Sequence, residues 1–407
     1  MSEIFKPDTN DQVLEAVKWA VAEEQSLDVY GHASKRQYGR PCPDGVNGLD
    51  LSNLTGISLY EPGELVMSAA AATPMSEIQN ALEESKQRLA FEPPNLGPLL
   101  GSGEGAGTVG GMFACNMAGP RRISAGSARD HILGFHAVSG RGEIFKSGGR
   151  VVKNVTGFDL SKLIAGSFGT LAAMTEVTFK VLPEPEKSRT VLVMTNDGAA
   201  GVSAMTEALH GSYEVSGAAH LPADIVSRSG VSYVRDAGSA VTAIRVEGPG
   251  PSVEYRANAL KELLSGYGET EELHTANTQT LWREMRDVSY FVSGDEQIWR
   301  LSVPPADGAS VVEKIQETLG GRALFDWGGG LIWLALDARS DAAHNDVRTA
   351  IQSVGGHATL IRAALDVRRK VPVFHPQPEV LAQLAVRVKK SFDPKGVLCP
   401  GRMVEGV

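Results

Sequence analysis

Residues 99–120 read Leu99-Leu-Gly-Ser-Gly-Glu-Gly-Ala-Gly-Thr-Val-Gly-Gly-Met-Phe-Ala-Cys-Asn-Met-Ala-Gly-Pro120, and the rest of the chain is organised around this glycine-rich stretch. Because glycine has no Cβ, its backbone N–H groups can turn toward a ligand, and a bulky group can lie directly against the chain. The stretch therefore predicts contact with a phosphate or a flat ring system.

A Rossmann dinucleotide loop is the first alternative for this stretch. Residues 105–110 match the G-x-G-x-x-G pattern, and Asp130 follows at roughly the spacing of a ribose-binding acidic residue. A Rossmann loop, however, follows a buried parallel strand, whereas residues 92–98 contain three prolines. A P-loop is also disfavoured, because no Lys-Ser or Lys-Thr pair follows the glycines.

The chain has 407 residues, of which 42% are hydrophobic and 21% are charged, as is typical of folded globular domains. This length allows two or three domains, each with its own core. The net charge of −9, without a basic run interleaved with aromatic residues, argues against nucleic-acid binding.

Cys42, Cys115 and Cys399 are too dispersed for a zinc site or a disulfide framework, so we expect no metal site and a reducing compartment. The first residues lack a secretory signal, and no run of about 18 apolar residues predicts a membrane span. We therefore expect a cytoplasmic protein, whose membrane association, at the inner face, would depend on partner subunits.

Apolar spacing and turn residues predict the elements of the first part of the chain. Thr9 and Gln12 have capping-box spacing ahead of an amphipathic helix. Thr73 and Pro74 predict the N-cap and first residue of a second helix. Strand-like runs, the last two joined as a hairpin, occupy residues 27–30, 57–61, 65–72, 132–138 and 143–145.

Two further turns are built from small residues. Residues 31–35 read Gly-His-Ala-Ser-Lys at the end of a predicted strand, where backbone N–H groups, a hydroxyl and a lysine could cradle a phosphate. An ordinary surface turn is the alternative. Residues 166–171, Gly-Ser-Phe-Gly-Thr-Leu, form another glycine-containing turn.

The pattern changes near Pro183 and Pro185, after which strand-like and helical runs alternate. We expect an α+β domain at residues 1–185, a second α+β domain at residues 186–370 and a C-terminal segment at residues 371–407. The C-terminal segment has an apolar helical face followed by an extended, proline-rich end.

Together, these turns and the tail resemble the FAD-binding family of vanillyl-alcohol oxidase and p-cresol methylhydroxylase (the PCMH type). The matching motifs are residues 108–111 with Asn116 and Gly119, Arg129-Asp130, residues 153–160, residues 166–171, Phe392-Asp393-Pro394 and Pro400-Gly401-Arg402. Within that family nearly the whole chain is most similar to the FAD-binding E subunits of bacterial glycolate oxidase, also called glycolate dehydrogenase.

The resemblance implies a two-lobed PCMH-type FAD-binding domain, an α+β cap or substrate domain, and a C-terminal tail that returns to the FAD domain. It implies a pyrophosphate loop at residues 31–35, isoalloxazine contacts at residues 108–119 and adenine-side contacts from residue 166 to 174. The FAD-binding residues it implies are Gly31, His32, Ala33, Ser34, Lys35, Thr108, Gly110, Gly111, Asn116, Gly119, Gly166, Ser167, Gly169, Thr170 and Met174.

The chain departs from the family pattern at two places. His32 and Ala33 stand where glycine is common, and Ala33 would be strained, by about 1 kcal/mol or more, in a turn that needs a positive φ. Cys399 stands where relatives usually have asparagine, which replaces an amide with a weak donor.

Catalytic residues are not identified by the pattern. The paired-histidine motif H-x-G-D-G-N-x-H of related catalytic subunits is absent from the sequence. His375 is the weak catalytic candidate, its alternative being a basic patch with Arg368, Arg369 and Lys370 that meets an acidic partner. Arg121 and Arg122 follow the central glycines and could neutralise a flavin or substrate anion, or simply be solvated.

The resemblance implies an FAD-dependent oxidoreductase that acts on CH–OH groups. More specifically, it implies an FAD-carrying subunit of a complex that oxidises glycolate or another small 2-hydroxy acid, with a second flavin subunit and an iron–sulfur subunit that receives electrons. A stand-alone FAD-dependent alcohol or hydroxy-acid dehydrogenase and a non-catalytic structural subunit are the alternatives.

Overall fold

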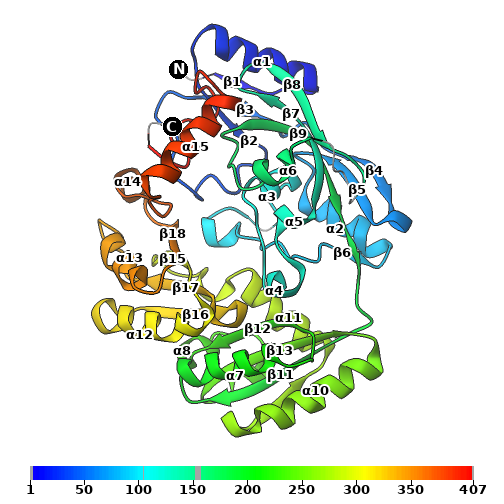
Figure 1. Cartoon of the computed structure of the whole chain (residues 1–407), viewed down its shortest axis with the longest axis vertical. Coiled ribbons are helices and arrows are strands. Elements are labelled where there is room, and N and C mark those ends of the chain that lie inside the picture. The colour runs from blue at the N-terminus through cyan, green and yellow to red at the C-terminus, as the bar shows by residue number, and fades with distance from the viewer. Residues whose placement is uncertain (1–2, 104, 152–156, 406–407) are drawn as a thin grey trace. The chain divides into compact units, whose positions relative to one another are not determined.

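The computed structural model describes residues 3–103, 105–151 and 157–405 of the chain (Figure 1). Residues 153–156 of the motif at 153–160 therefore lie outside the described residues.

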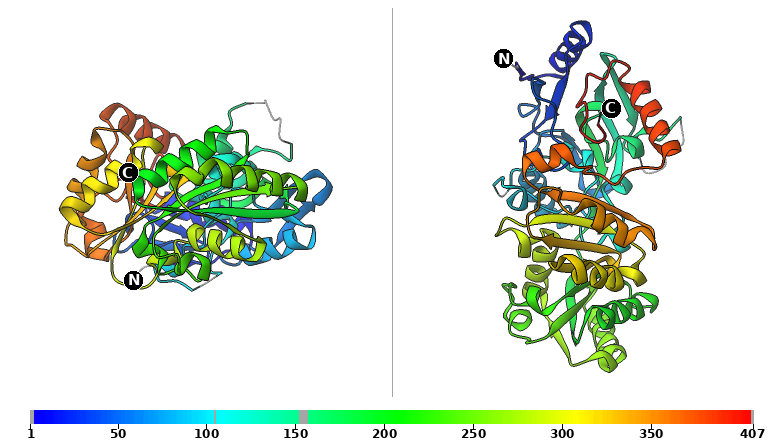
Figure 2. Two further views of the ribbon diagram at one scale, coloured as in Figure 1. Left: turned by 90° about the horizontal axis from the view of Figure 1, so that it is seen from below. Right: turned by 90° about the vertical axis from the view of Figure 1, so that its left-hand side faces the viewer.

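The chain divides into two compact units. Unit 1 is drawn from residues 1–118, 126–184 and 376–407, and unit 2 from residues 119–125 and 185–375. Both the N-terminal and the C-terminal segments thus belong to unit 1 (Figures 1 and 2).

A parallel sheet and one helix form the N-terminal part of unit 1. In the described residues this sheet has the order β1 (Ile4–Phe5), β3 (Asn47–Asp50), β2 (Leu27–Tyr30). Helix α1 (Asn10–Ala22) begins where predicted, with the Thr9 hydroxyl accepting the N–H of Gln12. Its buried side chains recur at helical spacing and pack against Leu27 and Leu49: Val13, Ala16, Val17 and Ala20. Each buried valine contributes about 1.5–3 kcal/mol to folding.

The C-terminal tail completes this same core. After α15 (Glu379–Phe392) the chain runs alongside β2, where the N–H of Leu27 donates to Val397 and the N–H of Cys399 donates to Leu27, both at 2.7 Å. Leu398 pairs in parallel with Leu27 and is fully buried. Residues from the two ends of the sequence therefore share one sheet edge.

The second sheet of unit 1 is antiparallel. In the described residues its order is β4 (Ile57–Glu61), β5 (Val66–Ala70), β9 (Ala172–Lys180), β7 (Ile132–Ser139) and β8 (Glu143–Gly148). The predicted hairpin is confirmed as the β7–β8 pair. A short pair joins β6 (Gln87–Arg88) to β10 (Leu182–Pro183).

Helix α2 (Met75–Glu84) starts one residue later than predicted. Thr73 does not cap it, because the Thr73 hydroxyl donates to the carbonyl of Ala70 at 2.7 Å and Pro74 occupies the N-cap position. The other helices of unit 1 besides α1 and α15 are α3 (Val109–Ala114), α5 (Ala128–His131) and α6 (Leu160–Ile164).

Unit 2 is built on one antiparallel sheet. Its strand order in the described residues is β14 (Thr270–Leu273), β11 (Lys187–Thr195), β13 (Ala240–Gly248), β12 (Val215–Leu221), β16 (Arg322–Asp326), β17 (Leu331–Leu336), β15 (Gln297–Ser302) and β18 (His357–Arg362). The helices are α4 (Arg122–Ala125), α7 (Gly198–His210), α8 (Ala223–Val226), α9 (Ser232–Arg235), α10 (Gly250–Leu264), α11 (Thr275–Arg286), α12 (Gly308–Leu319), α13 (His344–Gln352) and α14 (Leu365–Lys370).

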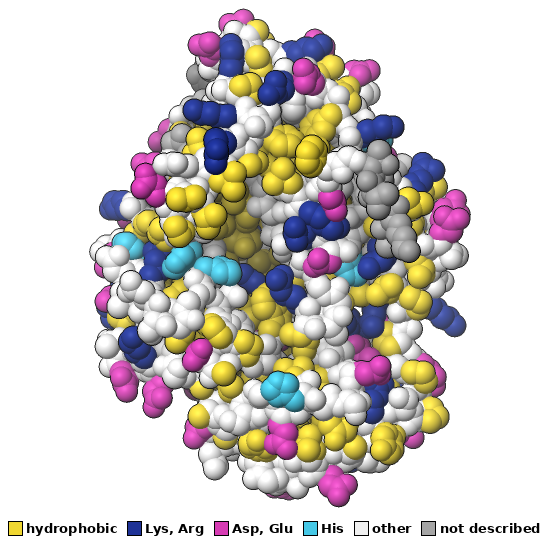
Figure 3. Space-filling model, viewed as in Figure 1, with side chains coloured by type: hydrophobic (Ala, Val, Ile, Leu, Met, Phe, Trp, Pro, Cys, Tyr) yellow, Lys and Arg dark blue, Asp and Glu magenta, His cyan; other side chains and the backbone are white. Residues whose placement is uncertain are grey.

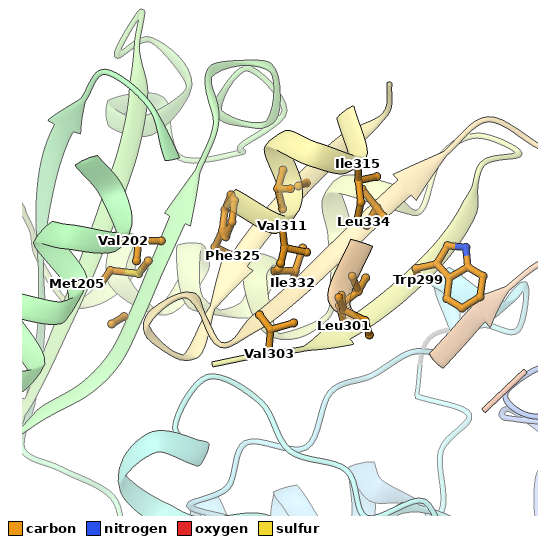
Figure 4. Packing of buried hydrophobic residues seen from close by; sticks show 14 of the residues in the cluster. Val202, Met205, Trp299, Leu301, Val303, Val311, Ile315, Phe325, Ile332 and Leu334 are labelled. Atoms are coloured by element: carbon orange, nitrogen blue, oxygen red, sulfur yellow. The ribbon is translucent and has the colours of Figure 1, made fainter. Parts of the chain in front are cut away.

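The core of unit 2 lies between this sheet and its helices. Figure 4 shows Val311 and Ile315 of α12 directed toward Ile332 and Leu334 of β17. Because side chains alternate along a strand, one face of β15 contributes Trp299 and Leu301 to the same core, while Arg300 between them points the other way.

Among the described residues, every helix is too short or too polar to cross a bilayer. On the face drawn in Figure 3, acidic and basic side chains are interspersed over the surface.

Candidate functional site

The loop at residues 31–35 leaves the end of β2 and turns back through Ala33. Ala33 has φ 58°, the left-handed conformation expected from the sequence, and the N–H of Arg36 closes the turn on the Ala33 carbonyl at 3.1 Å. Within the described part of the chain, the backbone N–H groups of residues 31–35 make no hydrogen bond to a protein acceptor. A loop with several free N–H groups is suited to bind an anion.

Lys35 adds a cation to this loop. Its Nζ lies 3.3 Å from the Ser34 hydroxyl, and within the described ranges no carboxylate lies at ion-pair distance from the amine. Burial lowers the pKa of Lys35. A buried amine without a carboxylate partner is stabilised when an anion binds beside it.

The central glycine stretch is fixed against the end of β5. The N–H of Gly110 donates to Ala71 at 2.7 Å, and the Thr108 hydroxyl accepts the N–H of Gly111 at the start of α3. A Cβ at position 110 would lie 2.7 Å from the Ala71 carbonyl oxygen, so only glycine fits. Because β5 belongs to an antiparallel sheet, the loop has no Rossmann context.

The third glycine turn is hydrogen-bonded to α3. The N–H of Gly166 donates to Phe113 at 3.2 Å, and that of Phe168 donates to Ala114 at 3.0 Å. The Phe168 ring also meets Tyr38 edge-on, with 5.1 Å between the ring centres. The three loops predicted from sequence are thus neighbours.

These loops enclose a cavity of about 810 Å³, a volume that includes space open to solvent. The predicted cofactor residues that line it are Gly31, His32, Ala33, Ser34, Lys35, Thr108, Gly110, Gly111, Gly169 and Met174. Ala114, Cys115, Phe168 and Ala172, which lie within the ranges implied at 108–119 and 166–174, line it as well. Its walls also contain residues outside those ranges, namely Asp28, Val29, Tyr30, Arg36, Leu51, Ala71, Ala72 and Arg402.

Five of the predicted cofactor residues do not line the cavity: Asn116, Gly119, Gly166, Ser167 and Thr170. Most of them instead make hydrogen bonds that fix the loops around the cavity. The Asn116 side chain accepts the N–H of Arg129 at 2.9 Å, and the Thr170 hydroxyl donates to the Ser167 carbonyl at 2.7 Å. Gly119 belongs to unit 2, where its carbonyl accepts the indole N–H of Trp327 at 3.0 Å.

Arg402 clamps the cavity loop from the C-terminal tail. Arg402 is 9% exposed, and its guanidinium donates to four main-chain carbonyls between residues 35 and 40, at 2.6–3.1 Å: those of Lys35, Arg36, Tyr38 and Arg40. In the sequence, Arg402 is marked only by the family motif Pro400-Gly401-Arg402, which does not indicate which carbonyls it contacts.

Cys399 has a structural position beside the cavity. Its Sγ accepts the N–H of Val29 at 3.3 Å, and burial raises the pKa of the Cys399 thiol to about 11. The thiol therefore stays protonated near neutral pH.

The polar candidates of the sequence analysis lie in unit 2. Arg121 forms an ion pair with buried Glu247, with 2.6 Å between Nε and Oε2, so its role is structural. Arg122 is exposed and stacks on Trp327. The Nδ1 atom of His375 accepts the N–H of Ala358 at 3.3 Å.

The glycine-lined cavity can be compared with known proteins. Residues 2–148 match the family model described as an FAD binding domain. The chain is 35% identical, over 97% of its own length and 97% of the relative's, to glycolate oxidase subunit GlcE of Escherichia coli K12. The chain belongs to the GlcE family.

Two further comparisons place this GlcE family member among flavoproteins. Glycolate oxidase subunit GlcD of Bacillus subtilis is 33% identical over 36% of this chain and 27% of its own length. The solved structure of p-cresol methylhydroxylase with substrate bound superimposes with a TM-score of 0.72 at 14% identity, covering 98% of this chain and 88% of that one. The latter likeness confirms the predicted PCMH-type α+β fold.

Membership of the GlcE family confirms FAD as the cofactor and an FAD-dependent oxidoreductase acting on CH–OH groups as the enzyme class. The cavity fits this cofactor, because it combines free backbone N–H groups and half-buried Lys35 with a glycine wall at residues 108–111. The N–H groups and the lysine suit a pyrophosphate, and the glycine wall allows a flat ring to lie against the backbone.

Proposed function

We propose that this chain is the FAD-carrying subunit of a complex that oxidises glycolate or a similar small 2-hydroxy acid and passes the electrons to an iron–sulfur subunit. The observation that carries the proposal is the 35% identity to a glycolate oxidase subunit over 97% of both chains. A second flavin subunit, similar to the GlcD relative, would complete the complex.

The cavity residues have separate roles in this proposal. Residues 31–35 would hold the FAD pyrophosphate through their N–H groups and the Lys35 amine. The wall at Thr108, Gly110 and Gly111 would lie against the isoalloxazine ring, and Gly169 and Met174 would lie on the adenine side. When bound, FAD supplies the two-electron acceptor for hydride removal from the substrate.

In this proposal the iron–sulfur cluster is held by a partner, and the cysteine content of the chain supports that assignment. Iron–sulfur clusters are generally held by four ligands, most often cysteine thiolates, whereas this sequence has three dispersed cysteines. In the structure Cys399 is engaged with Val29, and Cys42 donates to Asp28 at 3.3 Å. An iron–sulfur carrier would therefore have to be a separate subunit, and any association with the inner face of a membrane would depend on such partners.

Co-purification tests the proposal. The chain is expressed with an affinity tag in a host that carries its own glycolate-oxidising system, and the purified material is assayed for flavin, non-haem iron and glycolate-dependent dye reduction. We expect a second flavoprotein and an iron–sulfur protein to accompany the chain, and the assembly to reduce the dye.

The chain reconstituted alone with FAD is the control. A chain that purifies without companions and whose flavin is bleached rapidly by glycolate would contradict the proposal, because it would then be a stand-alone dehydrogenase. A chain that shows no flavin absorption band after reconstitution would reduce its role to a structural one.

A further inference from the structure

A buried ion pair joins α15 to the C-terminal tail. In α15, which lies wholly within the described part of the chain (red in Figure 1), Lys389 is the one buried residue. Its Nζ atom lies 2.6 Å from the Oδ2 atom of Asp393, and the Asp393 side chain is also buried. Side chains four residues apart on a helix are neighbours, so the pair forms within one turn.

The Lys389 amine also holds two main-chain carbonyls from separate segments. It donates at 2.8 Å to Thr170, in the third glycine turn (residues 166–171), and at 2.8 Å to Leu398, in the tail. Together with Asp393, these carbonyls are acceptors for the three N–H groups of one ammonium. The lysine thus joins the third glycine turn to the tail.

Asp393 is itself fixed by the tail and by the β7–β8 turn. Its Oδ1 atom accepts the N–H of Val397 at 2.9 Å, and its Oδ2 atom accepts the N–H of Leu398 at 2.8 Å. A Cβ at position 140, in the β7–β8 turn, would overlap the Asp393 carboxyl group, so Gly140 leaves the space that the carboxylate occupies. The position of the Lys389 ammonium is therefore set from several segments of unit 1.

The two carbonyls flank a direct contact beside the cavity. Gly169, which precedes Thr170, lines the cavity, and Cys399 follows Leu398. A Cβ on Gly169 would lie 3.4 Å from the Cys399 Sγ atom, so the two segments touch at this point. Lys389 therefore holds both sides of this contact.

The conformation of the third glycine turn requires support from outside the turn. Gly166, Phe168 and Gly169 have φ values of 85°, 54° and 77°, all in the left-handed region. A bulky residue such as Phe168 rarely adopts this conformation, and a strained backbone persists only where surrounding contacts fix it. The bond from Lys389 to Thr170 is one of these contacts, and it comes from a distant part of the sequence.

A buried ion pair is an inefficient way to stabilise a fold. Two buried charges lose their hydration, which offsets much of their attraction, and apolar side chains of similar volume often stabilise a core as well. Directed hydrogen bonds, in contrast, fix the positions of the carbonyls that they hold. The network at Lys389 is therefore better suited to shaping the adjoining wall than to adding stability.

We infer that Lys389 is a positioning residue for the adenine half of FAD. Among the described residues, those that line the cavity do not include Lys389, which acts through the Thr170 carbonyl on Gly169. This role rests on the proposed function for the placement of the adenine beside Gly169 and Met174. The lysine then sets the preference of the site for FAD over FMN, which lacks the adenine half.

Calorimetry on the full chain, freed of flavin, tests this role with three ligands. FAD carries both halves of the cofactor, FMN carries the flavin half with one phosphate, and ADP carries the adenine half with a diphosphate. The main variant combines Lys389→Met with Asp393→Asn, which removes both buried charges together and keeps an amide oxygen for the N–H groups of the tail.

Two further variants complete the experiment. Lys389→Arg keeps a cation beside Asp393, but a planar guanidinium cannot replace one nitrogen at which three acceptors meet. This variant decides the outcome if the double variant does not fold. Lys390→Met is the matched control, since Lys390 is the neighbouring lysine of α15 and is exposed.

We expect the dissociation constants of FAD and ADP to rise by about 10-fold or more in the double variant, and by a smaller factor in Lys389→Arg. The dissociation constant of FMN should remain unchanged in both, and Lys390→Met should bind all three ligands as the unaltered chain does. A merely structural role would weaken FAD and FMN equally, because loss of the fold removes both halves of the site together.

Unchanged affinities for FAD and ADP in the lysine variants, or an FMN affinity that falls as far as that for FAD, would overturn the inference. The outcome is separate from that of the proposed function, because none of these titrations uses glycolate. A chain that forms no glycolate-oxidising complex would contradict the proposed function and leave the ADP result intact. Unchanged ADP affinity in variants that still assemble and oxidise glycolate would remove the role of Lys389 alone.

Discussion

The guanidinium of Arg402 donates a 2.9 Å hydrogen bond to the main-chain oxygen of Lys35, and so joins two positions that lie 367 residues apart in the sequence. Three further carbonyls of the same loop accept from this side chain. The conformation of the anion-binding loop therefore depends on a residue of the C-terminal tail.

Replacing Arg402 with methionine should weaken both the fold and FAD binding. Hydrogen bonds that involve a charged group contribute about 1.5–3 kcal/mol each, and the loop carbonyls would lose their donors. We expect unfolding at lower denaturant concentration and an FAD dissociation constant raised by about 10- to 100-fold, measured by flavin fluorescence titration. Arg235→Met serves as the exposed control. Unaltered FAD affinity in Arg402→Met would show that the clamp does not shape the cofactor site.

Lys35→Met separates stability from cofactor affinity. Burial disfavours the charged amine, so the FAD-free protein should be at least as stable with methionine at this position. FAD affinity should fall by about 10-fold or more, because the cation beside the pyrophosphate is lost. Thermal unfolding without FAD and a titration with FAD measure the two effects. A variant that binds FAD normally would exclude the lysine from the pyrophosphate site.

Gly110→Ala should prevent FAD binding through the backbone. The added Cβ would lie 2.7 Å from both the oxygen and the Cβ of Ala71, so the glycine wall must move. Gly103→Ala is the matched control, since its Cβ would meet nothing within 4 Å. Purified Gly110→Ala should lack the flavin absorption band that Gly103→Ala retains. Equal flavin content in the two proteins would contradict this assignment.

We expect the free energy of unfolding of unit 2 to decrease in acid because of the buried side chain of His220. It is fully buried in β12, with Nδ1 2.9 Å from the Thr242 hydroxyl, and burial lowers its pKa to about 4. An unfolded chain protonates histidine near pH 6.5, so the unfolded state gains the proton first as the pH falls from about 6.5 to about 4. Stability is complete above that range and decreases by roughly 3 kcal/mol through it.

His220→Gln should flatten this pH dependence, whereas exposed His210→Gln should leave it unchanged. Urea unfolding across the same pH range is the measurement. An equally steep loss of stability in His220→Gln would assign the acid sensitivity to other groups.

Local patterns in the sequence were sufficient for much of the fold. Helix α1 and the β7–β8 hairpin follow from apolar spacing and turn residues, which act over a few positions. The positive φ of Ala33 could also be expected from the sequence, because the conformation of a short turn depends mainly on its own residues. Thr73 shows where such reasoning fails, since its hydroxyl bonds to Ala70 rather than capping the next helix.

Contacts between distant residues leave no periodic signal. The four carbonyls held by Arg402 cannot be inferred from the tail alone, since any loop of suitable shape could accept from it. Arg121 and Arg122 are adjacent and chemically equal, yet one pairs with buried Glu247 and the other stacks on Trp327. Only the folded arrangement distinguishes the structural arginine from the exposed one.

The late position of Arg402 has a consequence for biosynthesis. A ribosome must add 367 residues after Lys35 before the clamp exists, and the strand pairing of Leu27 with Leu398 is delayed in the same way. The nascent polypeptide therefore leaves the ribosome with its anion loop unclamped, and the clamped form of the loop exists only once the tail has been translated.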